Sequence, residues 1–417
     1  MRGRPRNWVP RGSWPCRFLV SAWEEAMVSI ISPERAFGGA LDDLVQRGFS
    51  RRQMLRVAAL LGAGAAFPFS SEHALAQLSD AGRLPDDAVK INANEFPEGP
   101  SKRALEALAA VAKRGNRYQY SETDALVESA ARLEGLRPEH FAVYPGSSLA
   151  LHHAVIAFTS PQRALVTAEP GYEAAAKAAE FIGSKVVRVP LRPDGSHDLP
   201  AMLAVAKAQP VGLFYVCNPN NPTGTVTPRA QIEALIAAKP QSSFVLLDEA
   251  YIHFCDEPPG VDLVRTDKDV IVLRTFSKVY GMAGLRAGFA LARHDLLERM
   301  TGYATGALPV TAMAAAHAML EEPGLVPARK RRNAETRADL MHFFEAHGFS
   351  YTPSVSNKLM VDARMPTQHV VDELKRRNVY VGRPWPVWPT HVRVSLGSRD
   401  DMLRFKAAFL EVTAARG

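Results

Sequence analysis

The chain of 417 residues contains only three cysteines, too few for a disulfide framework in a protein of this length. Cys16 lies near the N-terminus, while Cys217 and Cys255 each follow an apolar run, a position typical of small core residues. Cysteines and histidines nowhere show the spacing of metal ligands, so we expect no metal site. With 47% hydrophobic and 22% charged residues, the composition indicates a globular protein able to bury two cores.

The sequence also lacks a basic region of the kind that binds nucleic acid. Its net charge is +7, but residues 1–76 hold ten Arg and six Asp or Glu and so contribute four of these charges. The basic run at 328–332 opens an amphipathic helical stretch and indicates a solvated helix face. We therefore expect no nucleic-acid partner.

A long apolar run is missing as well, because the mildly apolar stretch 57–69 is too short to span a membrane. It follows Arg51-Arg52 and is followed by Ala74-Leu75-Ala76, and these three parts together resemble a twin-arginine export signal. We expect residues 1–76 to be an extension that carries this signal, and a mature periplasmic chain from near Gln77 without stable membrane insertion. Because the stretch before the arginines is unusually long, either translation starts downstream, for example at Met27, or the extension is disordered. The alternative to export is a cytoplasmic protein.

Short apolar runs alternate with helical patterns in the rest of the chain, which predicts an α/β fold with a mostly parallel sheet and helices on both faces. The expected strands are 141–144, 163–167, 185–189, 211–216, 243–247, 270–274 and 286–291. The expected helices include 147–158, 172–182, 228–238, 309–320, 325–347 and 398–414. These patterns predict a large domain at 116–305, a smaller α+β domain at 306–417, and a segment at 77–115 that joins the small domain.

Three successive apolar strands each lead into a polar cluster. The clusters are Cys217 to Gly224, Asp248 to Tyr251, and Thr275 to Lys278. The carboxyl ends of parallel strands share one edge of the sheet, where open α/β folds bind their ligands. An amide, a carboxylate, a phenol and a lysine are therefore expected to meet in one cleft.

Pyridoxal 5′-phosphate (PLP) requires such a set of groups. A lysine must bond to its aldehyde, and a carboxylate must keep the ring nitrogen protonated. Amide and phenol groups contact the ring oxygen, and the phosphate needs backbone N–H groups at a helix start together with cationic and hydroxyl donors. Taken singly, Lys278 would be a surface lysine and Asn221 part of a turn, so only their joint order indicates a cofactor site.

From about Ile91 to Phe409 the chain resembles the fold-type I PLP-dependent aminotransferases of classes I and II, and most closely the histidinol-phosphate aminotransferase branch. The motifs that carry the resemblance occur in the family's order: Asn92-Ala93-Asn94-Glu95, Asn116-Arg117-Tyr118, Pro145-Gly146-Ser147-Ser148, Pro170-Gly171-Tyr172, Asn220-Asn221-Pro222-Thr223-Gly224, Asp248-Glu249-Ala250-Tyr251, Ser277-Lys278 with Gly284-Leu285-Arg286-Ala287-Gly288, and Arg393-Val394-Ser395.

The resemblance implies a role for each matched residue. Lys278 would bond to the cofactor and move the proton between the substrate Cα and the cofactor, and Asp248 would face the ring nitrogen. Asn221 and Tyr251 would donate to the ring oxygen, and Tyr172 would stack on the ring.

The remaining matches imply a phosphate site, a dimer and a substrate contact. Tyr118 would reach the phosphate across the interface of a homodimer, and Arg393 would bind the substrate's acidic group with a bidentate geometry. The phosphate itself would be held by Gly146, Ser147, Ser277 and Arg286.

The sequence departs from the family at one motif, because Tyr118 is followed by Gln119-Tyr120 where the family continues Tyr-Pro-Asp. An exported copy would also have no access to histidine synthesis. We therefore expect an amino acid rather than histidinol phosphate as the donor, with an aromatic side chain favoured because Phe96, Trp385 and Trp388 could line the pocket. The alternatives are a PLP-dependent decarboxylase or lyase on the same scaffold and a non-catalytic PLP-binding protein.

Overall fold

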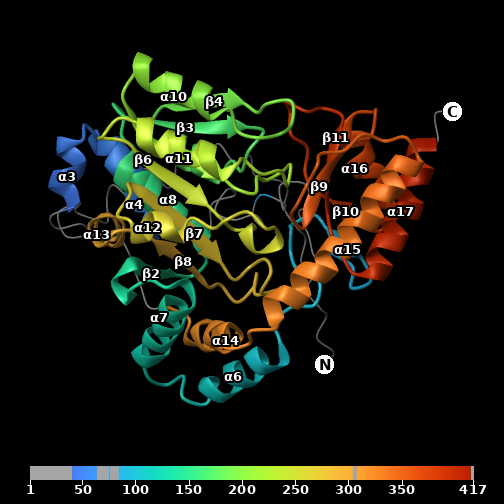
Figure 1. Cartoon of the computed structure of the whole chain (residues 1–417), viewed down its shortest axis with the longest axis horizontal. Helices are drawn as coiled ribbons and strands as arrows, with labels where there is room; N and C mark the ends of the chain where they lie inside the picture. Colours follow the sequence, from blue (N-terminus) through green and yellow to red (C-terminus); the bar gives the residue numbers. More distant parts are fainter. Residues whose placement is uncertain (1–39, 63–74, 76–83, 304–307, 415–417) are drawn as a thin grey trace, which may run out of the picture.

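The computed structural model describes residues 40–62, 75, 84–303 and 308–414, and its larger part is built on a seven-stranded sheet (Figure 1). The strands lie in the order β2-β8-β7-β6-β5-β3-β4. β8 runs antiparallel to both of its neighbours, whereas the pairs from β7 to β4 are all parallel. The strands are β2 (Phe141–Tyr144), β3 (Ala164–Glu169), β4 (Val186–Pro190), β5 (Val211–Cys217), β6 (Phe244–Asp248), β7 (Val270–Thr275) and β8 (Gly288–Leu291).

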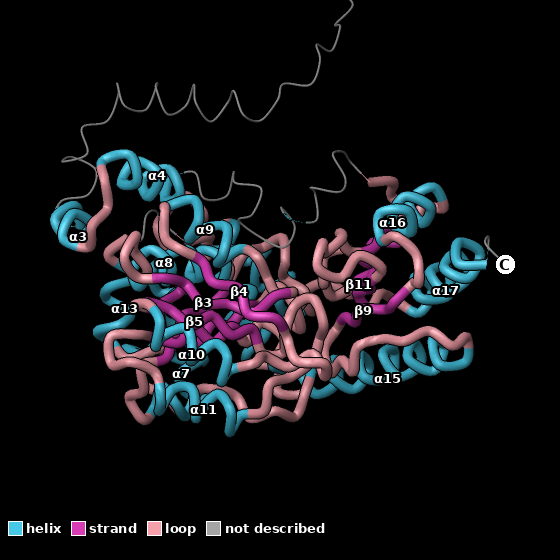
Figure 2. The backbone as a smooth tube through the Cα atoms, turned by 90° about the horizontal axis from the view of Figure 1, so that it is seen from above, coloured by secondary structure: helices cyan, strands magenta, loops and turns pink. Residues whose placement is uncertain are grey.

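Helices cover both faces of this sheet. Figure 2 shows α8 and α9 on one side of the strands and α7 and α11 on the other. Strands β5, β6 and β7 are buried along their whole length, which explains why they are apolar throughout instead of alternating. The helices of this part are α6 (Lys102–Ala112), α7 (Tyr120–Glu134), α8 (Ser147–Phe158), α9 (Ala174–Ile182), α10 (Leu199–Ala208), α11 (Arg229–Ala238), α12 (Val261–Arg265), α13 (His294–Thr301) and α14 (Val310–Leu320), with the short 3-10 helices η2 (Pro138–His140) and η3 (Ile252–Phe254).

The smaller part has a separate hydrophobic core. Its two short sheets pair β9 (Lys358–Asp362) with β11 (His391–Ser395), and β1 (Val89–Ile91) with β10 (Val379–Val381). The N-terminal strand β1 thus belongs to the C-terminal part, while α6 packs on α14 beside the large sheet. The helices here are α15 (Leu325–Ala346), α16 (Thr367–Arg376) and α17 (Arg399–Ala414).

Part of the N-terminal extension is packed against the large sheet's helices. It forms α3 (Ala40–Gln46) and α4 (Arg51–Gly62), and α4 contacts α9 (Figure 2). Val57 and Leu60 of α4 are buried in the main core, while Arg51 and Arg52 are exposed. The other predicted signal residues, 63–74 and 76, lie outside the described residues.

The predicted α/β architecture is confirmed. Each expected strand is present, with boundaries that differ by at most two residues, and 147–158 is a helix as predicted. The last predicted strand begins at Gly288 and not at residue 286, because Arg286 has a positive φ of 68° and the chain turns there. Among the described residues no helix is long and apolar enough to span a membrane.

Candidate active site

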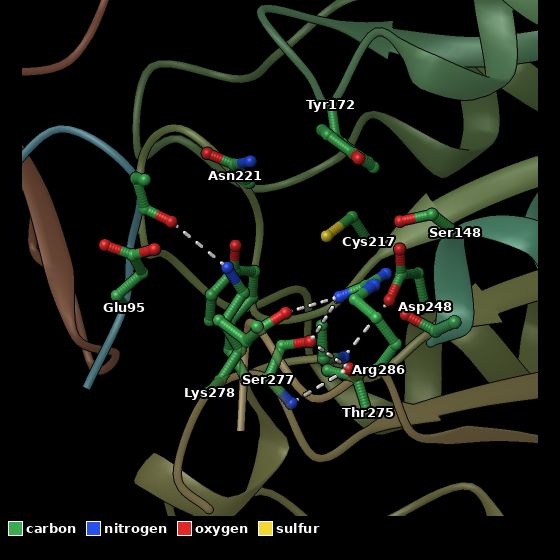
Figure 3. A pocket seen from close by; sticks show the side chains of 16 residues that line it. Glu95, Ser148, Tyr172, Cys217, Asn221, Asp248, Thr275, Ser277, Lys278 and Arg286 are labelled. Atoms are coloured by element: carbon green, nitrogen blue, oxygen red, sulfur yellow. Dashed lines mark hydrogen bonds between the residues drawn. The ribbon is translucent and has the colours of Figure 1, made fainter. Parts of the chain in front are cut away.

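A pocket of about 310 Å³ opens at the carboxyl ends of β5, β6 and β7 (Figure 3). This is the edge at which the sequence predicts a cleft. Of the eleven predicted site residues, eight line it: Ser147, Tyr172, Asn221, Asp248, Tyr251, Ser277, Lys278 and Arg286. The other three lie elsewhere. Gly146 is next to Ser147, Arg393 is fully buried behind Asn221, and Tyr118 is exposed on the surface.

Asp248, the last residue of β6, supplies a buried carboxylate on the pocket wall. Its Oδ2 accepts a hydrogen bond of 2.8 Å from the Tyr215 hydroxyl, and its Oδ1 accepts one of 3.1 Å from the Ala250 N–H. Burial raises the pKa of Asp248 above its ordinary value, and the hydrogen bond from Tyr215 opposes this rise. A cationic N–H placed against this carboxylate would offset the cost of burying its charge.

Lys278 extends into the pocket from the turn after β7. Its Nζ donates to the Ala93 carbonyl at 3.2 Å, and its side chain is almost entirely shielded from solvent. Figure 3 shows the amine in the middle of the pocket, between Glu95 and Ser277. An amine at this position is suited, in its unprotonated form, to nucleophilic attack on a carbonyl.

A buried polar network joins Tyr251, Asn221 and Arg393 across the two parts of the molecule. The Asn94 amide donates to the Tyr251 hydroxyl at 3.1 Å and to Asn221 Oδ1 at 3.4 Å. Arg393 Nη1 donates to the same Asn221 oxygen at 3.0 Å, and Nη2 donates to the Asn92 carbonyl. Arg393 lies on β11 of the smaller part, so this network fixes the small domain's position relative to the pocket.

The opposite end of the pocket collects donors suited to a phosphate. Ser147 begins α8, Arg286 Nη1 donates to Ser277 Oγ at 3.2 Å, and the Thr275 hydroxyl donates to the same oxygen at 3.0 Å. Gly146 has a φ of 91°, and a Cβ there would lie 2.2 Å from Arg286 Nη2. Only glycine therefore allows the guanidinium to lie against the start of α8, where helix N–H groups attract anions.

The two tyrosines expected to contact the ring and the phosphate of the cofactor, Tyr172 and Tyr118, occupy different positions. Tyr172 follows β3 and faces the pocket opposite Asp248 and Ser148 (Figure 3). Tyr118 is 76% exposed and stacks on Tyr120, with ring centroids 5.9 Å apart. Within one chain Tyr118 thus contributes nothing to the pocket.

Several residues that line or support the pocket were not singled out as site residues, although Cys217 and Thr275 belong to the polar clusters expected at this edge. Cys217, Ser148 and Thr275 line the pocket directly, and Tyr215 supports Asp248 from beneath. Burial raises the pKa of the Cys217 thiol, which keeps it neutral. Tyr215 and Cys217 are two residues apart on β5 and so share a face, a signal that the sequence offered.

The residues present fit PLP. The pocket has a lysine, a buried carboxylate that could pair with a cationic N–H group, and hydroxyls beside an arginine that lies against Gly146. Among the residues that the structure describes, no group of three or more His, Cys, Asp or Glu could hold a metal ion.

Comparison with known proteins agrees with this chemistry. Residues 86–409 match the model of the class I and II aminotransferases. The chain is 36% identical over 327 residues to a histidinol-phosphate aminotransferase of Symbiobacterium thermophilum, covering 77% of this chain and 90% of that protein. It is also 36% identical over 283 residues to an aromatic amino acid aminotransferase of Nocardia farcinica, covering 66% and 79%.

A solved structure has the same architecture. The histidinol-phosphate aminotransferase from Sinorhizobium meliloti, crystallised with pyridoxal 5′-phosphate, superposes with a TM-score of 0.73 at 25% identity, covering 82% of this chain and 97% of that chain. The comparisons thus agree with the fold described above, and both the cofactor PLP and an aminotransferase reaction are consistent with the residues of the pocket.

Proposed function

Since this chain belongs to the class I and II aminotransferases and is a PLP-dependent transaminase of fold type I, we propose that it transfers the amino group of an aromatic amino acid to a 2-oxo acid. The predictions of fold type I, of PLP and of an aminotransferase are confirmed. The family match and the aminotransferase relatives favour transamination over the decarboxylase and over the non-catalytic protein. The donor's identity is the part that we propose.

The observation that carries the donor proposal is the position of Trp385. Its indole N–H donates to the Gly171 carbonyl at 3.4 Å, next to Tyr172, and its ring centroid lies 5.1 Å from the Arg393 guanidinium carbon. An aromatic surface thus lies beside the arginine proposed to bind the donor's carboxylate. Phe96, Trp385 and Trp388 are not among the residues that line the pocket, and Phe96 is buried and stacks with Phe254.

The residues of the chain divide the reaction between them. PLP, when bound, accepts the electron pair that remains on the substrate Cα after its proton leaves. With PLP bound, Lys278 Nζ would take that proton from the substrate Cα and deliver it to the cofactor carbon that carries the transferred nitrogen. Asp248 would stabilise a positive charge on the ring nitrogen, and Arg393 would orient the donor through its acidic group. Water would then release the donor's carbon skeleton as a 2-oxo acid, and a second 2-oxo acid would take up the amino group by the reverse steps, with loss of one water.

A half-reaction tests the proposed donor class. The PLP-loaded chain is mixed with tyrosine, phenylalanine, aspartate or histidinol phosphate, and pyridoxamine phosphate and the oxo product are quantified. We expect stoichiometric pyridoxamine phosphate with the aromatic donors, which a decarboxylase would not form. Trp385→Ala should raise KM for these donors, whereas Trp388→Ala should not, since Trp388 is half-buried and its ring contacts His391 at a tilted angle. A reaction with histidinol phosphate alone contradicts the proposal.

We also propose that the enzyme is a homodimer in which Tyr118 completes the partner's phosphate site. The support is its exposure beside other exposed apolar side chains of α6 and α7, Leu105, Tyr120 and Leu133. Mixing inactive Lys278→Ala chains with Tyr118→Ala chains should produce mixed dimers that contain one intact site. Recovery of activity on mixing supports the proposal, and a monomer in sedimentation analysis contradicts it.

Finally, we propose export to the periplasm through the segment that begins at Arg51. The paired arginines are exposed at the start of α4 and so accessible to a receptor. Fractionation of cells that express the full chain, compared with a variant carrying Arg51→Lys and Arg52→Lys, tests this. Equal periplasmic amounts of both chains, or none of either, contradict it.

A further inference from the structure

A second lysine lies beside the cofactor pocket, and the chemistry above does not use it. Lys358 begins β9 in the small domain and is fully buried, with 0% of its surface exposed. Its Nζ lies 3.0 Å from the centroid of the Tyr251 ring and donates to Ser356 Oγ at 3.1 Å. Burying an ammonium group is costly unless its surroundings compensate the charge, and the face of an aromatic ring does so.

Lys358 lies in the electrostatic neighbourhood of the reacting groups. Lys278 Nζ is 5.6 Å from the centroid of the same Tyr251 ring. The positive charge of Lys358 opposes the rise in the pKa of both Asp248 and Cys217 that burial causes. Lys278, Lys358 and Asp248 are thus charged groups near this ring, Glu95 also lines the pocket beside Lys278 (Figure 3), and Arg393 is one hydrogen bond further away through Asn221.

The segment that carries Lys358 is anchored to the loop that follows β1 and to the large domain. The Asn357 amide donates to the Asn94 carbonyl at 3.0 Å, and the Asn94 side chain donates to the Tyr251 hydroxyl. The Val355 N–H donates to the Gly224 carbonyl at 2.9 Å. The small domain therefore places Lys358 on the ring's face while Asn94 holds the ring's hydroxyl.

We propose that Lys358 is a positioning residue whose ammonium holds the Tyr251 ring in place and adds a positive charge beside Lys278. Because like charges repel, the ammonium of Lys358 disfavours the protonated form of the Lys278 nitrogen. This nitrogen should therefore lose its proton at a lower pH than it would without Lys358. Fixing Tyr251 also keeps its hydroxyl at the place where the cofactor's ring oxygen is expected. The inference rests on PLP binding and is independent of which donor is used.

The test is a pH titration of the absorption spectrum of the PLP-loaded chain without substrate. In Lys358→Met, which keeps the length and apolar stem, the midpoint of the spectral change should move up by about one pH unit, since a neighbouring like charge is lost. Lys358→Gln, which keeps a donor toward Ser356, is the second variant and should move the midpoint in the same direction. Either variant that folds and retains PLP is sufficient for the measurement.

Lys239→Met is the matched control. Lys239 is also a buried lysine near an aromatic ring, 5.9 Å from the Phe244 centroid and 2.8 Å from Asp269, but it precedes β6 at the opposite end of the sheet. Its loss should lower stability and leave the midpoint unchanged. An unchanged midpoint in Lys358→Met with bound PLP overturns the proposal. So does a change confined to KM for acidic substrates, which would make Lys358 a substrate contact. Failure of the aromatic donors alone affects only the proposed donor class.

Discussion

Tyr215→Phe removes one hydroxyl from the buried side of Asp248 and keeps the volume of the ring. Tyr215 is 1% exposed, and its hydroxyl donates to Asp248 at 2.8 Å. In the variant the carboxylate retains only the Ala250 N–H among the hydrogen bonds described above. Hydrogen bonds to charged groups contribute about 1.5–3 kcal/mol, so we expect the free energy of unfolding of the PLP-free chain to fall by about 2 kcal/mol near neutral pH.

The loss should depend on pH with a defined sign. Burial raises the pKa of Asp248, and the Tyr215 hydroxyl lowers it because it stabilises the charged form. The wild-type chain therefore has its full advantage over the variant at pH values above the folded-state pKa of Asp248. This advantage is lost as the pH falls through that pKa, because a protonated carboxyl gains less from the donor.

Urea unfolding of the PLP-free chain at neutral and at acidic pH measures this difference. Tyr144→Phe is the control, because the Tyr144 hydroxyl is also buried in the same sheet but has no hydrogen-bond partner among the described residues. Removing it should cost little or even stabilise the fold. A deficit in Tyr215→Phe that equals that of Tyr144→Phe, or one that is the same at both pH values, refutes the reasoning.

Three further outcomes are expected. Gly146→Ala should weaken PLP binding at least tenfold in equilibrium titrations, because its Cβ would collide with Arg286 and the backbone there has a positive φ. Arg393→Lys should raise KM for the carboxylate donor more than it lowers kcat, since lysine cannot form the bidentate contact; a pure kcat effect would be inconsistent with substrate binding. Burial lowers the pKa of both His152 and His153 to about 4, from 6.5 in the unfolded chain. The folded chain thus resists protonation that the unfolded chain accepts, and stability should fall as the pH drops from about 6.5 to 4, by roughly 2 kcal/mol per histidine at about pH 5. Replacing both with Gln should flatten this slope in unfolding curves.

The sequence predicted the core of the site because strand ends are determined by local pattern. Asp248 and Lys278 follow apolar runs of adjacent parallel strands, and parallel strands bring their carboxyl ends to one edge. The same reasoning placed Asn221 after β5. The positions of such residues can be predicted without knowing how the two domains pack against each other.

Two residues near the pocket, Lys358 and Tyr215, were harder to predict because neither follows the end of a predicted strand of the large sheet. Lys358 begins a short strand of the small domain, and no periodicity shows that it reaches Tyr251. Tyr215 lies inside the apolar run 211–216, which predicted only a strand. The signal in both cases was a polar group within an apolar strand, which must find a partner when it is buried.

The N-terminal extension shows how one pattern can serve two purposes. Met54, Val57, Leu60 and Leu61 recur at helical spacing and are buried. This spacing predicts an amphipathic helix with a docking face, whereas the Arg pair before it indicated only an export signal. We expected residues 1–76 to form an extension that carries an export signal, separate from the folded domains. The structure instead packs α4 against α9.

Docking of α4 gives the apolar face of this helix two competing destinations under the proposed export. Val57 and Leu60 can be buried against the enzyme's own domain or can bind a membrane or a peptidase, but the two kinds of contact exclude each other. Under this proposal the domain would bind its own signal segment. The free energy of α4 docking would set the fraction of molecules whose segment is free for export. A substitution on α9 that weakens this contact should therefore change the rate of export and leave the catalytic activity unchanged.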